Sequence, residues 1–102
     1  MRFLVIERVK GGGSEVGKFA ELAEKDLAYK LGLQKKKKII GGGPFVDILA
    51  DGYILETDSI EEMGEIFFNS PSNFFVEREV HPLGTFADSM EGMQEIRKSR
   101  RK

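Results

Sequence analysis

The spacing of apolar residues predicts a strand followed by a helix in the first third of the chain. Residues 2–9 are rich in Phe, Val and Ile without clean alternation, which favours a strand covered on both faces. Apolar residues then recur at helical spacing from 16 to 31. Ser14 precedes them as a helix N-cap and Gly32 follows as a C-cap, so we expect a helix between these two residues. Its apolar stripe consists of Val16, Phe19, Ala20, Ala23, Leu27 and Leu31.

The middle of the chain predicts two strands and a second helix. The stretch "KKKKIIGGGP" indicates a short strand that ends in a turn, because glycine allows sharp changes of backbone direction. Residues 45–57 follow, either as a hairpin turning at Asp51-Gly52 or as one interrupted strand. Ser59 and Glu62 have the spacing of a capping box. The stripe of the helix that they start consists of Ile60, Met63 and Phe67.

The last third predicts one more strand and a terminal helix. Residues 74–80 alternate clearly, and we expect their even-numbered positions, Arg78 among them, to face the helices. Asp88 and Glu91 have capping-box spacing at the start of a final helix that carries Met90, Met93 and Ile96. The order is that of an α+β, ferredoxin-like βαββαβ fold, with helices on one face of an antiparallel sheet and an added C-terminal helix. We assign residues 1–86 to this domain and 87–102 to the helix and its basic tail.

Two such sheets closing face to face would cover the face without helices, which predicts a dimeric α+β barrel. The chain has 102 residues, 40% of them hydrophobic, and a formal net charge of −1, as expected for one globular domain. No apolar run approaches the roughly 18 residues of a membrane span, and we expect the opening run to be a strand and not a signal peptide. The absence of cysteine fits a cytoplasmic location.

The stretch "GGGSEVGKF" (residues 11–19) matches most of a phosphate-binding P-loop, but its chemistry differs. Phe19 stands where that motif needs a hydroxyl to hold magnesium, and Gly17-Lys18 fall inside the predicted helix. A flexible connection between strand and helix is the better interpretation. The basic runs at 35–38 and 98–102 are short and lack interleaved aromatic residues, so we expect no nucleic-acid binding.

Three segments resemble muconolactone isomerase and its relatives among the dimeric α+β barrels: "EKDLAYKL" (24–31), "GYILETDSIEEM" (52–63) and "SPSNFFVEREVHPL" (70–83). The "GGGP" turn, with "SIEEM", "NSP" and "VHPL" after it, also resembles the YCII-like family. That family places a histidine on its first helix, where this chain has Asp26. The resemblance implies a dimer or a multiple of dimers, and a proton shift in a lactone without a cofactor.

His81 and Glu7 are the predicted catalytic residues. His81 shares a strand face with Glu79, and a carboxylate two residues away can orient an imidazole as a general base. The alternative for His81 is a solvated position at the end of a strand. Glu7 lies among apolar residues on one face of the first strand, where an enclosed carboxylate suits acid–base chemistry. Its alternative is an ion pair with Arg8, Arg78 or a lysine.

Tyr53 and Glu79 are the predicted substrate-binding residues, with the Tyr53 phenol orienting the substrate by a hydrogen bond. Arg78 has the right geometry to clamp an anion, but we expect it to extend past the helices to the surface. Asp47 is predicted to lie in a turn or at a pocket rim. One histidine and scattered carboxylates give no metal-ligand spacing, so we expect no metal.

The sequence therefore predicts a cytoplasmic homodimer that binds a small organic acid or lactone, without cofactor, membrane or nucleic acid. Isomerisation by proton transfer is the leading interpretation. The alternative is a module of the same fold that binds a small ligand or supports assembly without catalysis, which the departure at Asp26 favours. RNA binding through an open sheet is a third interpretation, which requires a monomer and a strong dependence on salt.

Overall fold

A computed structural model describes residues 1–10 and 16–100 of the chain. Four strands and three helices follow one another in the order β-α-β-β-α-β-α. Their bounds are β1 Arg2–Val9, α1 Val16–Lys35, β2 Ile39–Pro44, β3 Ala50–Glu56, α2 Ile60–Phe68, β4 Val76–Leu83 and α3 Phe86–Arg100. In the described part of the chain, every helix is too short or too polar to cross a bilayer.

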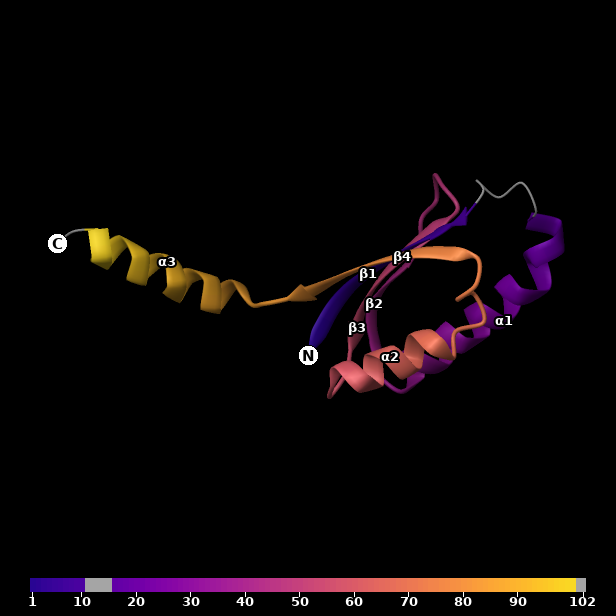
Figure 1. The fold of residues 1–102 in the computed structure, drawn as a ribbon, viewed down its shortest axis with the longest axis horizontal. Helices are drawn as coiled ribbons and strands as arrows, with labels where there is room; N and C mark the ends of the chain where they lie inside the picture. Colours follow the sequence, from indigo (N-terminus) through magenta and orange to yellow (C-terminus); the bar gives the residue numbers. More distant parts are fainter. Residues whose placement is uncertain (11–15, 101–102) are drawn as a thin grey trace.

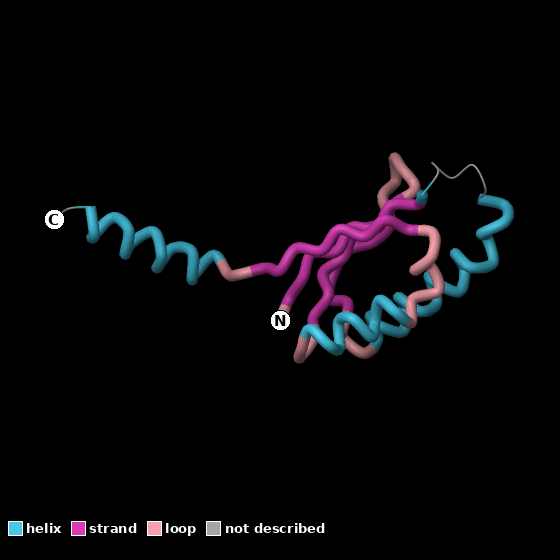
Figure 2. Tube along the Cα trace, viewed as in Figure 1, coloured by secondary structure: helices cyan, strands magenta, loops and turns pink. Residues whose placement is uncertain are grey.

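The strands form one antiparallel sheet in the order β2-β3-β1-β4, and α1 and α2 cover one of its faces (Figures 1 and 2). β1 is central, and its residue Glu7 pairs with Asp51 of β3 and with Arg78 of β4. Because these three residues share a register position, their side chains emerge on the same face of the sheet. The predicted α+β fold, with helices on one face and an added C-terminal helix, is confirmed.

The core lies between the sheet and the two covering helices. Alternate residues of β1 and β3 point into it, while Leu33 of α1 and Met63 of α2 close it from the other side. The buried members of this core are Phe3, Val5, Leu33, Ile39, Tyr53 and Leu55. Leu4, Ile6 and Ile54 alternate with them and lie half-buried on the face of the sheet without helices.

The face of α1 that packs on the sheet differs from the predicted stripe. Asp26 and Leu33 are buried, whereas Leu27 and Leu31 are 54% and 59% exposed. The face that packs on the sheet consists of Asp26, Tyr29, Lys30 and Leu33. It packs there because Glu7 and Asp51 on the strands provide polar partners for Lys30. Val16 and Phe19 lie outside the residues whose side chains are described, and Ser14 lies outside the described chain.

The ends of the helices correct two predicted caps. Gly32 lies inside α1 and does not cap it. The helix is terminated by Lys37, which has a left-handed φ of 60°. The amides of Lys37 and Lys38 donate to the carbonyl oxygens of Gln34 and Leu33 in the last helical turn. Ser59 does cap α2, because its hydroxyl accepts the amide of Glu62 at 3.1 Å. At α3 the cap is Thr85, whose hydroxyl accepts the amide of Asp88 at 3.0 Å, and not the predicted Asp88–Glu91 box.

The glycine cluster lies inside β2 and not in a turn after it. Gly42 has a φ of 112°, and a Cβ atom there would lie 2.2 Å from the carbonyl oxygen of Gly52 on the neighbouring strand. The turn comes later, at residues 45–49, so that Asp51 and Gly52 belong to β3 and form neither a hairpin nor an interruption. Of the preceding lysines, Lys35 is the last residue of α1, and residues 36–38 form the turn that follows it. None of the four belongs to the edge strand β2.

β4 starts two residues later than predicted. Val76, Arg78 and Val80 face the helices as expected. Phe74 and Phe75 belong to the preceding turn, so Phe75 is buried and Phe74 is 89% exposed, the reverse of the prediction.

Helix α3 lies apart from the rest of the chain (Figure 1). The Cα radius of gyration is 17.5 Å, compared with about 13 Å for a compact domain of this length. Each residue from 81 to 100 is exposed. The chain therefore has a compact βαββαβ body and a helix that projects from the end of β4.

Candidate functional site

A cluster of charged side chains lies between the sheet and α1, inside an otherwise apolar core. Its members come from β1, β3, β4 and α1, and we call it the Lys30 cluster. It consists of Glu7, Asp26, Lys30, Asp51, Tyr53 and Arg78.

Glu7 is the most enclosed member, with 2% of its surface exposed. The alternation of β1 places it on the same face as Phe3 and Val5. Its Oε1 accepts from Lys30 Nζ at 2.6 Å, and its Oε2 accepts from Arg78 Nε at 2.7 Å and from the Tyr53 hydroxyl at 3.1 Å. Burying a carboxylate costs free energy unless the carboxylate is paired with a cation and hydrogen-bonded. Both oxygens of Glu7 meet this condition.

Lys30 joins three carboxylates. Its Nζ lies 2.6 Å from Glu7 Oε1, 2.8 Å from Asp26 Oδ2 and 2.5 Å from Asp51 Oδ2. Burial lowers the pKa of Lys30, but the charge of Glu7 and the hydrogen bonds to the three carboxylates raise it further, so the pKa lies above its usual value. Lys30 therefore stays an ammonium ion and cannot act as a base or as an amine nucleophile.

Asp51, near the start of β3, differs from Glu7 in having an oxygen to spare. Its Oδ2 binds Lys30, whereas Oδ1 is buried and has no hydrogen-bond partner among the described residues. Burial raises the pKa of Asp51 above its usual value, although the hydrogen bond from Lys30 opposes this shift. Asp51 is thus a carboxyl group that can titrate and that can accept a further donor.

Arg78 and Tyr53 complete the surroundings of Glu7. Arg78 donates from Nη1 to Asn73 at 2.9 Å, and its guanidinium lies 4.3 Å from the centre of the Phe67 ring. Burial and the negative charge of Glu7 raise the pKa of Tyr53, so its phenol stays protonated and acts as a hydrogen-bond donor. Arg78 is 14% exposed and paired with Glu7, which corrects the prediction that it extends to the surface.

Asp26 is fixed by the turn that precedes β4. The Ser70 hydroxyl donates to Asp26 Oδ1 at 2.9 Å, and the Ser70 and Ser72 hydroxyls lie 2.9 Å apart. All three side chains are buried. These hydrogen bonds hold Asp26 of α1 against the turn. Lys30 follows one helical turn later on the same face of α1, so its side chain projects over the sheet.

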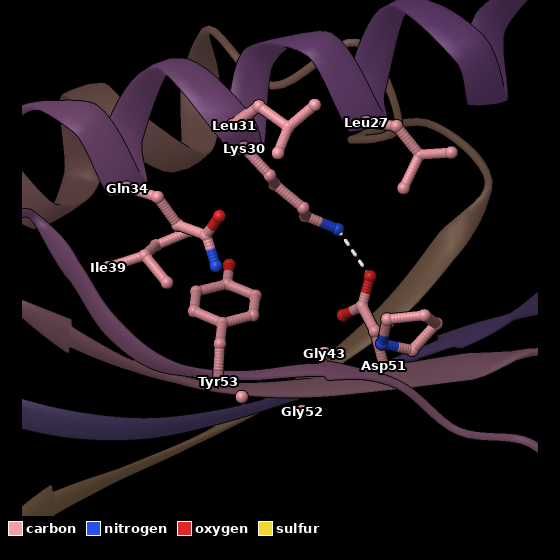
Figure 3. A pocket seen from close by; sticks show the side chains of 11 residues that line it. Leu27, Lys30, Leu31, Gln34, Ile39, Gly43, Asp51, Gly52 and Tyr53 are labelled. Atoms are coloured by element: carbon pink, nitrogen blue, oxygen red, sulfur yellow. Dashed lines mark hydrogen bonds and ion pairs between the residues drawn. The ribbon is translucent and has the colours of Figure 1, made fainter.

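Two cavities meet at the Lys30–Asp51 pair. The first, which we call the β2 cavity, has a volume of about 110 Å³ and lies between α1 and the glycines of β2 (Figure 3). The second, the loop cavity, has about 240 Å³ and extends toward the turn at residues 45–49. Both are lined by Leu27, Lys30, Pro44 and Asp51. In the β2 cavity Tyr53 lies beside this pair, and Gln34 lines the same cavity nearer to Ile39 (Figure 3).

The three acidic members of the cluster also have the spacing of a metal site. Oxygens of Glu7, Asp26 and Asp51 lie within 4.8 Å of one another. Lys30 Nζ contacts all three at 2.8 Å or less, so the ammonium ion takes the place that a cation would need. The set fits a lysine better than a metal.

The predicted site residues divide between the two faces of the sheet. Glu7 and Tyr53 belong to the Lys30 cluster, whereas His81 and Glu79 lie on the face without helices, with His81 Nε2 and Glu79 Oε2 2.6 Å apart and exposed. Glu7 and His81 therefore do not share a site within one chain, and a catalytic role for His81 stays a prediction. Asp47 lies exposed in the turn after β2.

Sequence reasoning missed Lys30 and Asp51 and did not assign Asp26 to a site. Asp26 and Lys30 are four residues apart and so share a helix face, a signal that the apolar stripe beside them outweighed. Asp51 precedes Tyr53 and Leu55 at strand spacing, but the Asp-Gly pair favoured a turn.

No family model matches the chain, and no curated protein matches it either. Among solved structures it is similar to the 5-chloro-2-hydroxyhydroquinone dehydrochlorinase TftG from Burkholderia phenoliruptrix AC1100, in complex with 2,5-dihydroxybenzoquinone. The identity is 23% and the TM-score 0.69, over 86% of this chain and 98% of that chain. Protein Atu4242 from Agrobacterium tumefaciens is 13% identical, with a TM-score of 0.44, over 84% of this chain and 96% of that chain. The likeness to TftG shows a shared α+β barrel fold.

Proposed function

We propose that the protein is an enzyme that moves a proton on a small ring molecule, such as a lactone, without a cofactor. The observation that carries this proposal is the environment of Asp51. This carboxyl lines both cavities, has one oxygen fixed by Lys30 and keeps a second oxygen without a partner among the described residues. A general base works best when its pKa lies near the working pH, and burial shifts the pKa of Asp51 in that direction.

The other members of the Lys30 cluster support this role. Lys30 holds Asp51 in position and offers a fixed positive charge beside the β2 cavity. The same charge would stabilise negative charge that develops on a substrate oxygen during proton removal. Glu7 uses both its oxygens on Lys30, Tyr53 and Arg78, so we propose that it positions these groups and does not contact the substrate.

The size of the β2 cavity limits the substrate. Its volume of about 110 Å³ is somewhat below the roughly 150 Å³ that accommodate benzene in a protein core, so a six-membered ring would extend past Lys30 and Asp51 into the loop cavity of about 240 Å³. Leu27, Leu31 and Ile39 supply apolar walls, and the Gln34 amide supplies a neutral polar group for a carbonyl or hydroxyl. TftG is named for action on a hydroxylated ring, so hydroxyquinones belong beside lactones and organic acids among the compounds to test.

We also propose that two chains pair through the open face of their sheets. Helices cover the other face, while Leu4, Ile6 and Ile54 are left half-buried at the centre of this one. A second sheet would bury them and enclose His81 and Glu79 between the subunits. Native mass spectrometry tests this pairing: an even oligomer supports it, and a stable monomer contradicts it.

The catalytic proposal is tested by hydrogen exchange. We would incubate the protein in D₂O with a panel of unsaturated lactones, small organic acids and hydroxyquinones, and follow deuterium uptake by mass spectrometry. Asp51→Asn should slow exchange of any active compound by about 10²-fold or more, the usual contribution of a general base. Asp47→Asn is the matched control, because Asp47 is exposed and outside both cavities.

Two results would contradict parts of this proposal. Exchange at the wild-type rate in Asp51→Asn would remove Asp51 as the base. A compound that binds in the β2 cavity, so that Gln34→Ala weakens its binding, but that is neither exchanged nor converted would favour the alternative of a ligand-binding module without catalysis.

A further inference from the structure

Helix α3 presents an apolar stripe that no described residue of its own chain covers. Phe86, Met90, Met93 and Ile96 follow one another at spacings of four, three and three residues, and they are 96%, 61%, 63% and 52% exposed. An isolated helix of 15 residues is only marginally stable in water, and Gly92 weakens this one further. The stripe therefore needs a surface to pack on.

The body of the protein has a second uncovered apolar surface, around the mouth of the two cavities. It combines α1 with the turn between β2 and β3, and we call it the cleft rim. Its members, between 38% and 59% exposed, are Leu27, Leu31, Phe45, Ile48 and Leu49. All of them line the β2 cavity or the loop cavity.

The helix and the rim of one chain lie at opposite ends of the sheet. β4 ends where Leu83 pairs with Arg2, at the start of β1, whereas Leu49 of the rim bonds to Val9 at the end of β1. Figure 1 shows α3 projecting away from the side of the molecule where α1 begins. To reach its own rim, α3 would have to reverse at Gly84, run the length of the sheet and cross to the helical face.

The charges of the two surfaces are complementary. The last turn of α3 carries three basic residues, Arg97, Lys98 and Arg100. Arg97 and Arg100 lie beside Met93 and Ile96 of the apolar stripe. On α1, Glu24 is exposed one helical turn before Leu27. A helix laid along the rim can therefore pair its basic end with Glu24.

We infer that α3 of one chain packs against the cleft rim of a second copy of the chain. In a two-fold dimer the exchange occurs twice. Each stripe on its rim would bury on the order of 1,000 Å², which is about the lower limit for a specific interface, and the two exchanges together exceed that limit. The exchanged helix would close the cavity mouth above Lys30 and Asp51 and exclude water from it. This inference does not depend on the proposed proton transfer, and its test measures contacts and not turnover.

The chain has no cysteine, so introduced thiols report proximity without background. We would co-express Met93→Cys and Leu31→Cys as single variants and treat the purified protein with a short bis-maleimide. Mass spectrometry then separates mixed pairs from pairs of identical chains. Met93→Cys with Glu61→Cys is the matched control, because Glu61 is exposed on α2 and away from the rim.

We expect mixed Leu31→Cys pairs to exceed the Glu61→Cys control at least fivefold. Three results would overturn the inference. The first is equal cross-linking in the test and control pairs. The second is a cross-link within one chain of the double variant Leu31→Cys/Met93→Cys, which would place α3 on its own rim. The third is preferred cross-linking of Met93→Cys to Ile54→Cys, which would place α3 on the open face of the sheet.

Discussion

Replacing Lys30 with methionine removes the ammonium ion that Glu7, Asp26 and Asp51 share, while keeping most of the apolar stem. The Lys30 side chain is only 14% exposed and that of Glu7 only 2%, so water cannot take over the lost contacts. Removing one partner of a buried ion pair costs about 3–5 kcal/mol. We expect a loss near the middle of that range, about 4 kcal/mol, from the roughly 5–15 kcal/mol that stabilise a domain.

Urea unfolding at pH 7, followed by far-ultraviolet circular dichroism at fixed protein concentration, measures this loss. Lys25→Met is the matched control, because Lys25 pairs with Glu21 at 3.6 Å on the same helix but both side chains are well exposed. An exposed pair contributes at most about 1 kcal/mol. The two variants should therefore differ by at least 2 kcal/mol.

Asp51→Asn tests the cause of the loss. In the Lys30→Met background it removes one of three carboxylates that lie within 4.8 Å of one another, so it should restore part of the stability. A Lys30→Met variant no less stable than Lys25→Met would refute the reasoning, because the cluster would then not depend on its ammonium ion. Loss without recovery by Asp51→Asn would refute charge repulsion as the cause.

Three further predictions concern the backbone and the alkaline range. Gly42→Ala should destabilise the protein by about 2 kcal/mol or more in urea unfolding, because its Cβ would meet backbone atoms at a φ of 112°. Gly43→Ala, with open space around it, should change stability by less than about 1 kcal/mol. Lys37→Gly should raise the free energy of unfolding by about 0.5–1 kcal/mol by relieving a left-handed φ of 60°, and an unchanged midpoint would contradict this. Lys30 and Tyr53 have pKa values above their usual 10.5 and 10.0, so their stabilisation is complete below pH 10 and is lost as the pH rises further. Wild-type stability should consequently fall more steeply above pH 10 than that of Tyr53→Phe, and parallel curves would exclude the Tyr53 contribution.

The fold was predictable because its signals are local. β1 and α2 lie close to where apolar spacing placed them, and the Ser59 cap follows from a side chain and an amide three residues apart. The element order then left few topologies for an antiparallel sheet with helices on one face. The turn before β3 was wrong because Asp51-Gly52 has the chemistry of a hairpin turn, whereas pairing with β1 extends β3 through both residues.

The candidate site could be predicted only in part. The sequence predicted Glu7 among apolar residues on one face of the first strand and Tyr53 as a hydrogen-bonding residue, and the structure brings the two into contact. The partners of Glu7 come from 23, 46 and 71 residues away, and no spacing rule links such positions. Asp26 and Lys30 were hidden by the apolar stripe of the same helix, of which Leu27 and Leu31 line the β2 cavity and not the core.

The sequence by itself determined the elements, their order and the fold class, because hydrophobic spacing and caps act over a few residues. Tertiary structure alone decided which face of α1 meets the sheet. A buried Glu7 needs cationic partners, and burying Lys30 on it satisfies both charges, whereas Leu27 and Leu31 lose less by staying at the rim of a cavity. The same choice brings Lys30 to Asp51 and so creates the candidate site.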